Sequence, residues 1–224
     1  MAERALSQQA QWAVGLACAL AFGAMTRYPG GTVLDRTSAG YSLSRNFLSD
    51  LGMTVAYDGQ FNRLGAALFV LSLLVLVVGL GSVVITISRR LSGHHAARRW
   101  ARFAAVLGLL ACLAFLGVAV TPENRVMAVH VILTQWAWRL IPIVAALLAV
   151  ASFQTPRLRA RVAIVWVILA ILMASYAALL SWGPSLATAD GLVFQALAQK
   201  IASVVVIAAL LLVAREFDRP VGLL

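Results

Sequence analysis

The chain has 224 residues, of which 62% are hydrophobic and only 12% charged, and its mean hydropathy is +0.92. Soluble domains carry about 25% charged residues, so this composition excludes an ordinary soluble globule and predicts an integral membrane protein whose apolar surface lies in lipid. The net charge of +10 would suit a nucleic-acid-binding protein. However, the arginines stand in short runs between apolar segments, and no basic stretch interleaved with aromatic residues occurs, so we expect no nucleic-acid partner.

Six apolar segments are each long enough to cross a bilayer, which takes about 20 predominantly apolar residues in a helix. Gly and Pro residues lie in the breaks between them and interrupt helices there. The sequence therefore predicts an all-α fold, a single transmembrane domain of about six helices over residues 1–224 with an ordered extracytoplasmic loop at 28–63. The predicted helices are 11–27, 64–87, 100–120, 130–153, 162–182 and 192–214.

The basic residues divide unevenly between the two sides of such a bundle. Cytoplasmic connections of membrane proteins carry an excess of Lys and Arg, so we expect both termini in the cytoplasm and the protein in the cell inner (plasma) membrane. The arginines between 89 and 102 could also bind anionic lipid, but topology alone explains them. The residues assigned to the cytoplasmic side are Arg4, Arg89, Arg90, Arg98, Arg99, Arg157, Arg159, Arg161, Arg215 and Arg219, and those assigned to the outer side are Arg27, Arg36, Arg45, Arg63 and Arg125 with Asp35, Asp50, Asp58 and Glu123.

The first apolar segment has two interpretations. It follows Arg4 and ends in small residues at 21–24, as a cleaved signal peptide does, but it is long for the apolar region of such a peptide. Gly15, Ala19 and Gly23 recur every four residues, a pattern that lets a membrane helix pack closely on its neighbours. We therefore expect a retained helix whose small-residue face contacts the bundle.

The connection at 28–63 is long, and loops of more than about 12–15 residues tend to be functional or disordered. Ser42 or Ser44 is placed to cap a short helix that runs through Leu51 and ends at Gly52. Such a helix would be amphipathic and could lie at the membrane interface or fold back over the bundle. Its predicted apolar face holds Leu43, Phe47 and Leu51, and its predicted polar face holds Asn46, Ser49 and Asp50.

Short motifs follow one another in an order found in a known family. The stretch Tyr41–Gly52 comes first, then Phe61-Asn62, Thr121-Pro122-Glu123 and His130. This order resembles the prokaryotic multi-pass membrane family called domain of unknown function 998, which has no established activity. The resemblance implies a multi-pass membrane protein. Two departures from the family pattern are Glu123 directly after the proline and Gln199-Lys200 in place of an acidic-Arg pair.

Polar residues from separate segments converge on the predicted outer side. Asp50, His130, Ser49 and Glu123 are the candidate catalytic residues, because hydrolysis or proton transfer needs groups that hold, orient and accept a proton. The alternative is that these groups only tie the long loop to the bundle by hydrogen bonds.

Other polar residues are candidate ligand-binding groups. Arg139 and Lys200 fall near the middle of predicted helices, where charges are costly and normally face the bundle interior. They could line a polar cavity for an anionic headgroup or substrate, pair with Asp190, Glu123 or backbone carbonyls, or extend their charged ends to the membrane surface. His130 and Arg139 are nine residues apart and so about half a turn out of phase, which argues against one shared cavity. The full set of candidate ligand-binding residues is Asn46, Asn62, Arg139, Lys200 and Gln199.

No metal site or cofactor is predicted. Zinc sites usually use three or four protein ligands. His94 and His95 are predicted on the side opposite His130, so the only possible ligand set is His130 with Asp50 and Glu123, and it is weakly supported. The sequence contains no nucleotide-binding glycine pattern, serine elbow or Cys-x-x-Cys motif.

Three functions fit these observations. The first is binding or processing of a lipid or hydrophobic small molecule in a polar pocket of the outer leaflet. The second is a small transporter or lipid-moving protein, although no inverted repeat is visible. The third is an accessory subunit of a membrane complex. Membrane lipids are the expected partners, and a homo-oligomer or a partner membrane protein is left open, as is whether the protein is an enzyme.

Overall fold

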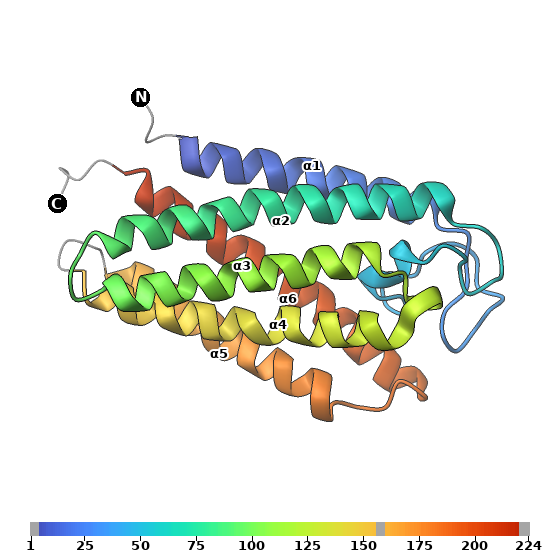
Figure 1. The fold of residues 1–224 in the computed structure, drawn as a ribbon. Helices are drawn as coiled ribbons and strands as arrows, with labels where there is room; N and C mark the ends of the chain where they lie inside the picture. The colour runs from blue at the N-terminus through green and yellow to red at the C-terminus, as the bar shows by residue number, and fades with distance from the viewer. Residues whose placement is uncertain (1–4, 156–159, 220–224) are drawn as a thin grey trace.

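The computed structural model describes residues 5–155 and 160–219, and within them the fold is all-α. Six long helices run back and forth through the molecule, and a short 3₁₀ helix, η1, lies in the first connection (Figure 1). Two isolated β-bridges also lie in that connection, between Gly30 and Ala39 and between Val55 and Phe61. The elements are α1 (Ala5–Arg27), η1 (Leu48–Gly52), α2 (Arg63–Ser92), α3 (Arg98–Val120), α4 (Glu123–Phe153), α5 (Ala160–Trp182) and α6 (Ala189–Phe217).

Each of the six predicted segments lies inside one observed helix, and the observed helices extend further at their ends. The extension follows from flanking polar residues that continue or cap a helix. Thr188 caps α6 by accepting a hydrogen bond from the Gly191 amide. Helix α4 begins before the predicted segment for another reason. Val126 has non-helical angles (φ −138°, ψ 51°), so the first turn of α4 is a separate turn joined to the main helix.

Five helices, α2 to α6, are long and apolar enough to cross a membrane. Helix α1 is not among them, since Gln8, Gln9 and Gln11 make its first half more polar. The chain therefore has the architecture of a multi-pass, membrane-embedded helical bundle. Six crossings remain a prediction.

The helices pack in chain order, and α6 closes the bundle. Neighbours from α1 to α5 contact one another in sequence, while α6 contacts α5, α1 and α2 and so completes the bundle. The beginning of α1 and the end of α6 lie at the same end of the molecule (Figure 1), where the Ser7 amide donates to Asp218 Oδ2 at 2.7 Å.

The packed face of α1 is not the predicted one. Gly15 and Ala19 are exposed, and nothing lies within 4 Å of a Cβ built at Gly15. The buried positions are Leu6, Ala10, Ala17 and Ala24, and the last three recur every seven residues. The expectation that Gly15, Ala19 and Gly23 form the contact face was therefore wrong at its first two positions, because a seven-residue spacing keeps one seam of a helix on its neighbour.

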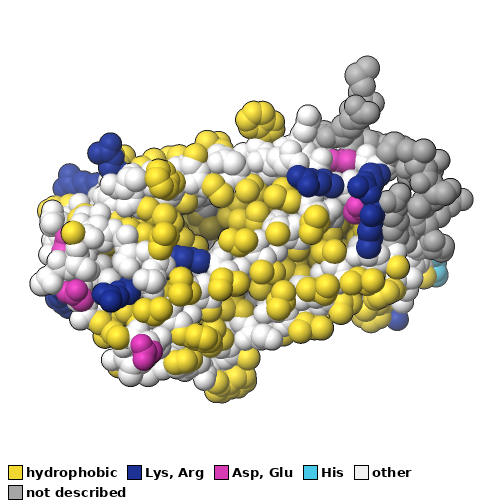
Figure 2. Space-filling model, turned by 180° about the vertical axis from the view of Figure 1, so that it is seen from behind, with side chains coloured by type: hydrophobic (Ala, Val, Ile, Leu, Met, Phe, Trp, Pro, Cys, Tyr) yellow, Lys and Arg dark blue, Asp and Glu magenta, His cyan; other side chains and the backbone are white. Residues whose placement is uncertain are grey.

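The surface matches a molecule that sits in lipid. Figure 2 shows hydrophobic side chains over the middle of the visible face and most charged side chains near its two ends. One end holds the 28–62 connection and the other holds the arginines of the α2–α3 connection and of the α6 end. Arg4, Arg157 and Arg159, which were assigned to the cytoplasmic side, lie outside the described residues.

Candidate functional site

A cavity of about 460 Å³ lies inside the bundle and is lined by side chains from all six helices and from η1. On α2 its lining runs from Phe69 to Val84, which is about 22 Å at 1.5 Å per residue. Two lining residues, Phe22 on α1 and Val204 on α6, are also exposed on the outside of the bundle. The cavity therefore reaches the surface between α1 and α6, and Figure 2 shows a hollow in the apolar middle of the visible face.

The cavity wall is apolar, with large aromatic side chains. Trp138 stacks edge-on against Phe115 and Tyr176, with ring centroids 5.3 and 4.9 Å apart. Two polar atoms on the wall, Trp166 Nε1 and Thr134 Oγ1, are buried without a hydrogen-bond partner among the described residues. Buried polar groups normally have partners, and these two donors have none among the described residues.

Residues 41–52, which we call the loop cap, close one end of the cavity. The predicted helix from Ser42 or Ser44 to Leu51 does not form, and only η1 is helical. Asn46 causes the difference, because its side-chain oxygen accepts a hydrogen bond from the Ser42 amide at 2.9 Å and closes a turn there. Phe47 then takes an extended conformation before η1 begins.

The predicted faces of that helix also change. Leu51 is fully buried whereas Leu43 is 62% exposed, so these two residues do not share an apolar face. Ser49 lines the cavity rather than lying beside Asn46 and Asp50.

Asn46 and Asp50 form the buried polar centre of the loop cap, with 0% and 1% of their surfaces exposed. Asp50 Oδ2 accepts hydrogen bonds from Asn46 Nδ2 at 2.9 Å and from the Phe47 amide at 3.0 Å. Asn46 Nδ2 also donates to the Gly31 carbonyl at 3.0 Å. The pair thus ties together two parts of the long connection.

Helix α6 forms hydrogen bonds with the loop cap. Gln199 Oε1 accepts from the Leu48 amide at 2.7 Å. Lys200 Nζ donates to the Asn46 carbonyl at 2.6 Å and lies 5.6 Å from the centre of the Tyr41 ring. Both side chains line the cavity, so its polar end lies where the loop cap meets α6.

Asn62 fastens the other end of the loop cap. Its side-chain amide donates to the Leu51 carbonyl at 2.9 Å and to the Met53 carbonyl at 3.0 Å. A Cβ added to Gly52 would lie 2.8 Å from the Phe69 ring, so glycine allows η1 to sit directly on α2. Asn62 therefore acts in the structure as a fastener of the loop and does not line the cavity.

Three predicted site residues have partners elsewhere. His130 Nδ1 donates to the Thr121 carbonyl at 2.6 Å, at the α3–α4 connection. Glu123 accepts from the Tyr57 hydroxyl at 3.3 Å, and Arg139 donates to the Ser181 hydroxyl at 3.0 Å. None of the three lines the cavity. Within residues 5–155 and 160–219, no three His, Cys, Asp or Glu side chains are grouped so that they could hold a metal ion.

Burial raises the pKa of Asp50 to about 7, and the nearby charge of Glu123 adds to this effect. Because the folded pKa lies above that of the unfolded chain, Asp50 favours folding below about pH 4, and this contribution is lost as the pH rises through 7. The expected loss between pH 4 and pH 8 is on the order of 4 kcal/mol.

The Asp50→Asn variant should not show this loss, since its side-chain oxygen can still accept from Asn46 and Phe47 while carrying no charge. Thermal unfolding in detergent from pH 5 to pH 8.5 measures the difference. Asp190→Asn, at an exposed position on α6, is the control. If the melting temperatures of wild type and Asp50→Asn change in parallel with pH, the raised pKa of Asp50 is contradicted.

Sequence reasoning missed the residues of the cavity wall. Trp166 lies within a nearly continuous apolar run, and such a run does not distinguish a cavity face from a lipid face. Tyr41, which lies in the loop cap and not on the cavity wall, was also missed, although it opens the stretch that carries the family resemblance. Its hydroxyl donates to the Asn46 carbonyl at 3.3 Å and to the Phe47 carbonyl at 3.2 Å.

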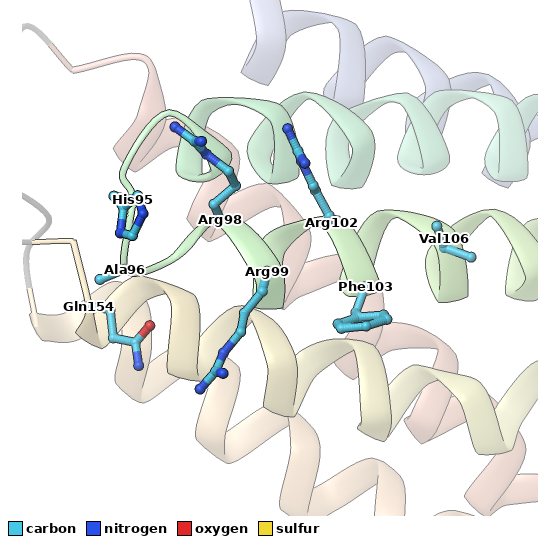
Figure 3. Close-up of a pocket in the computed structure, with 8 residues that line it drawn as sticks. All are labelled: His95, Ala96, Arg98, Arg99, Arg102, Phe103, Val106 and Gln154. Atoms are coloured by element: carbon cyan, nitrogen blue, oxygen red, sulfur yellow. The ribbon is translucent and has the colours of Figure 1, made fainter.

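A second concavity, of about 790 Å³, lies at the opposite end of the bundle. Figure 3 shows that its arginines do not converge, since Arg99 extends along one side of α3 while Arg98 and Arg102 extend along the other. A single anion could not contact all three, so this surface does not form a defined site. The residues that line it are His95, Ala96, Arg98, Arg99, Arg102, Phe103, Val106 and Gln154.

The fold and the cavity define the class of the protein as a membrane-type helical bundle with an internal apolar chamber beneath a polar loop cap. Comparison with models of known families, with curated proteins and with solved structures gives no match. The resemblance to domain of unknown function 998 therefore remains a prediction.

Proposed function

We propose that this protein binds a lipid or hydrophobic small molecule in the cavity and exchanges it with the bilayer between α1 and α6. The cavity itself carries this proposal. Its volume of about 460 Å³ lies in the range of ligand pockets, roughly 300–1,000 Å³. Its apolar wall suits a hydrocarbon chain, and its polar groups gather at the loop cap.

The energetics of packing support an occupied cavity. Protein interiors are close-packed, and empty core volume costs about 24 cal/mol per Å³. An unfilled space of about 460 Å³ inside the bundle would leave its wall without many of these packing contacts. A bound apolar molecule restores these contacts.

The proposed setting is the cell inner membrane, with six crossings and both termini in the cytoplasm. The arginines at the α2–α3 connection and at the end of α6 support this orientation through the positive-inside rule. In this orientation the loop cap faces outward, and the polar end of the cavity lies toward the outer leaflet. The family resemblance is compatible with the same multi-pass arrangement.

Binding is favoured over catalysis by the arrangement of the polar residues. His130 and Glu123 are engaged at the α3–α4 connection and do not line the cavity, so the candidate catalytic set is not assembled around the chamber. Two alternatives are a transporter and an accessory subunit. A purified chain that is stable without a partner protein and carries a bound ligand would argue against both.

Lipid analysis of the purified protein tests the proposal. We expect one tightly held lipid or hydrophobic small molecule per chain in native mass spectra recorded after extensive delipidation in mild detergent. A spectrum of ligand-free protein only, or of many lipids in graded numbers that wash away together, would contradict the proposal. A co-purifying protein subunit in fixed ratio would instead favour the accessory role.

A further inference from the structure

The polar end of the cavity is a set of hydrogen-bond donors. Lys200 Nζ uses two of its three protons, one on Asn46 and one on the Ala196 carbonyl at 3.2 Å. Gln199 accepts with its side-chain oxygen, while its amide nitrogen has no acceptor among the described residues. The Ser49 hydroxyl, also on the cavity wall, has no partner there either. Three donors thus line one end of a chamber whose wall is mainly apolar.

The charge of Lys200 lacks a direct counter-ion. Among the described residues no carboxylate lies within ion-pair distance of its ammonium group. Asp50 is near enough to interact with Lys200, but its Oδ2 is bonded to Asn46 and Phe47. Because burial raises the pKa of Asp50 to about 7, its carboxyl is only partly ionised at neutral pH and neutralises Lys200 only in part. An unpaired charge in an apolar setting is costly, and an anionic ligand would remove that cost.

We propose that the ligand is a single-chain amphiphile with an anionic head, a carboxylate or a phosphate, and that Lys200, Gln199 and Ser49 bind this head. This inference rests on the proposed function and names its ligand class. The hydrocarbon chain extends into the bundle along α6, where the lining continues to Leu210, about 15 Å beyond Lys200. Unlike Lys200, Arg139 donates to Ser181 away from the cavity and takes no part in binding.

Equilibrium binding in detergent micelles tests the head group, with purified chain that has been stripped of its co-purified ligand in a harsher detergent and shown to be empty by native mass spectrometry. The probes all have sixteen carbon atoms: palmitic acid, hexadecyl phosphate and neutral hexadecanol. Wild type should bind at least one of the two anions tenfold or more tightly than hexadecanol. The preferred anion identifies the head as carboxylate or phosphate, and equal preference defines it by charge alone.

Variants separate the charge from the fold. Lys200→Gln keeps a donor for the Asn46 carbonyl, and it should lower anion affinity about tenfold while leaving hexadecanol affinity unchanged. Lys200→Arg should retain anion binding, and Arg139→Gln is the matched control that should behave as wild type. Thermal unfolding of each variant confirms that it is folded.

Two failures are distinguishable. If all three probes bind equally to wild type and to Lys200→Gln, the anionic head is wrong while the cavity proposal stands. If none of the probes binds to any folded variant, the proposed function itself fails.

Discussion

Replacing Ala145 with phenylalanine is expected to abolish ligand binding while leaving the fold intact. Ala145 is 1% exposed and lines the cavity from α4. A benzyl group there would occupy space that the ligand needs and would supply apolar contacts in its place. Co-purified ligand should fall by at least tenfold, and added ligand should no longer raise the melting temperature, since only a molecule that binds the folded state stabilises it.

The neighbouring residue provides a matched control. Ala146 is exposed on the same helix and does not line the cavity, so Ala146→Phe should keep its bound ligand. Native mass spectrometry on the two variants, prepared identically, gives the comparison. Should Ala145→Phe be folded and retain wild-type ligand content, the ligand does not lie in the chamber. Ala111→Phe, which fills the cavity from α3, repeats the test if Ala145→Phe does not fold.

Replacing Asn46 with alanine is expected to have the largest effect on stability. The Asn46 side chain is fully buried and makes three hydrogen bonds, to the Ser42 amide, the Gly31 carbonyl and Asp50. Each buried partner left without a hydrogen bond costs about 1–3 kcal/mol, so a loss of about 3–5 kcal/mol in the free energy of unfolding is expected. The loop cap should then come away from α6 before the bundle unfolds.

Limited proteolysis of the 28–62 connection, combined with thermal unfolding, measures both effects. Cleavage in that connection should become much faster in Asn46→Ala, whereas Arg45→Ala, at an exposed neighbouring position, should match wild type. Unchanged cleavage and an unchanged melting temperature would show that the loop cap does not depend on the hydrogen bonds of Asn46.

The long helices could be predicted from the sequence because their signal is local. An apolar run between Gly and Pro breaks has few alternatives to a helix in lipid, and each predicted segment lies within an observed helix. The face that a helix buries is a different matter. The four-residue spacing of Gly15 and Ala19 predicts a contact face, but the face that holds Ala10 and Ala17 is buried against the bundle instead.

The candidate site could be predicted from the sequence only in part, since Ser49, Gln199 and Lys200 line the cavity whereas His130, Glu123 and Arg139 do not. Asn46 and Asp50 are four residues apart and do bond to each other, although through a side-chain turn and η1 rather than through one helix. The contact between Lys200 and Asn46 joins positions 154 residues apart, which no local pattern encodes. His130 was grouped with Asp50 because both were expected at the outer side, yet its hydrogen bond to Thr121 is local.

The cavity itself could not be predicted from the sequence. Its lining combines small residues such as Gly108 and Ala111 with large ones such as Trp138, and which of them border one cavity depends on how six helices come together. In the printed sequence these residues belong to runs of uniformly high hydropathy. The same composition would suit a tightly filled core or a lipid-facing surface.

Photo-crosslinking with an acyl chain that carries a diazirine near its end tests the central claim most directly. The labelled amphiphile is supplied to membranes containing the protein, and crosslinked peptides are mapped by mass spectrometry. A chain held in the cavity should label interior residues such as Ala145 and Trp166, which are each 1% exposed. Labelling confined to outward-facing positions such as Leu109 and Ile171 would contradict the account, because it would place the chain on the outer surface of the bundle.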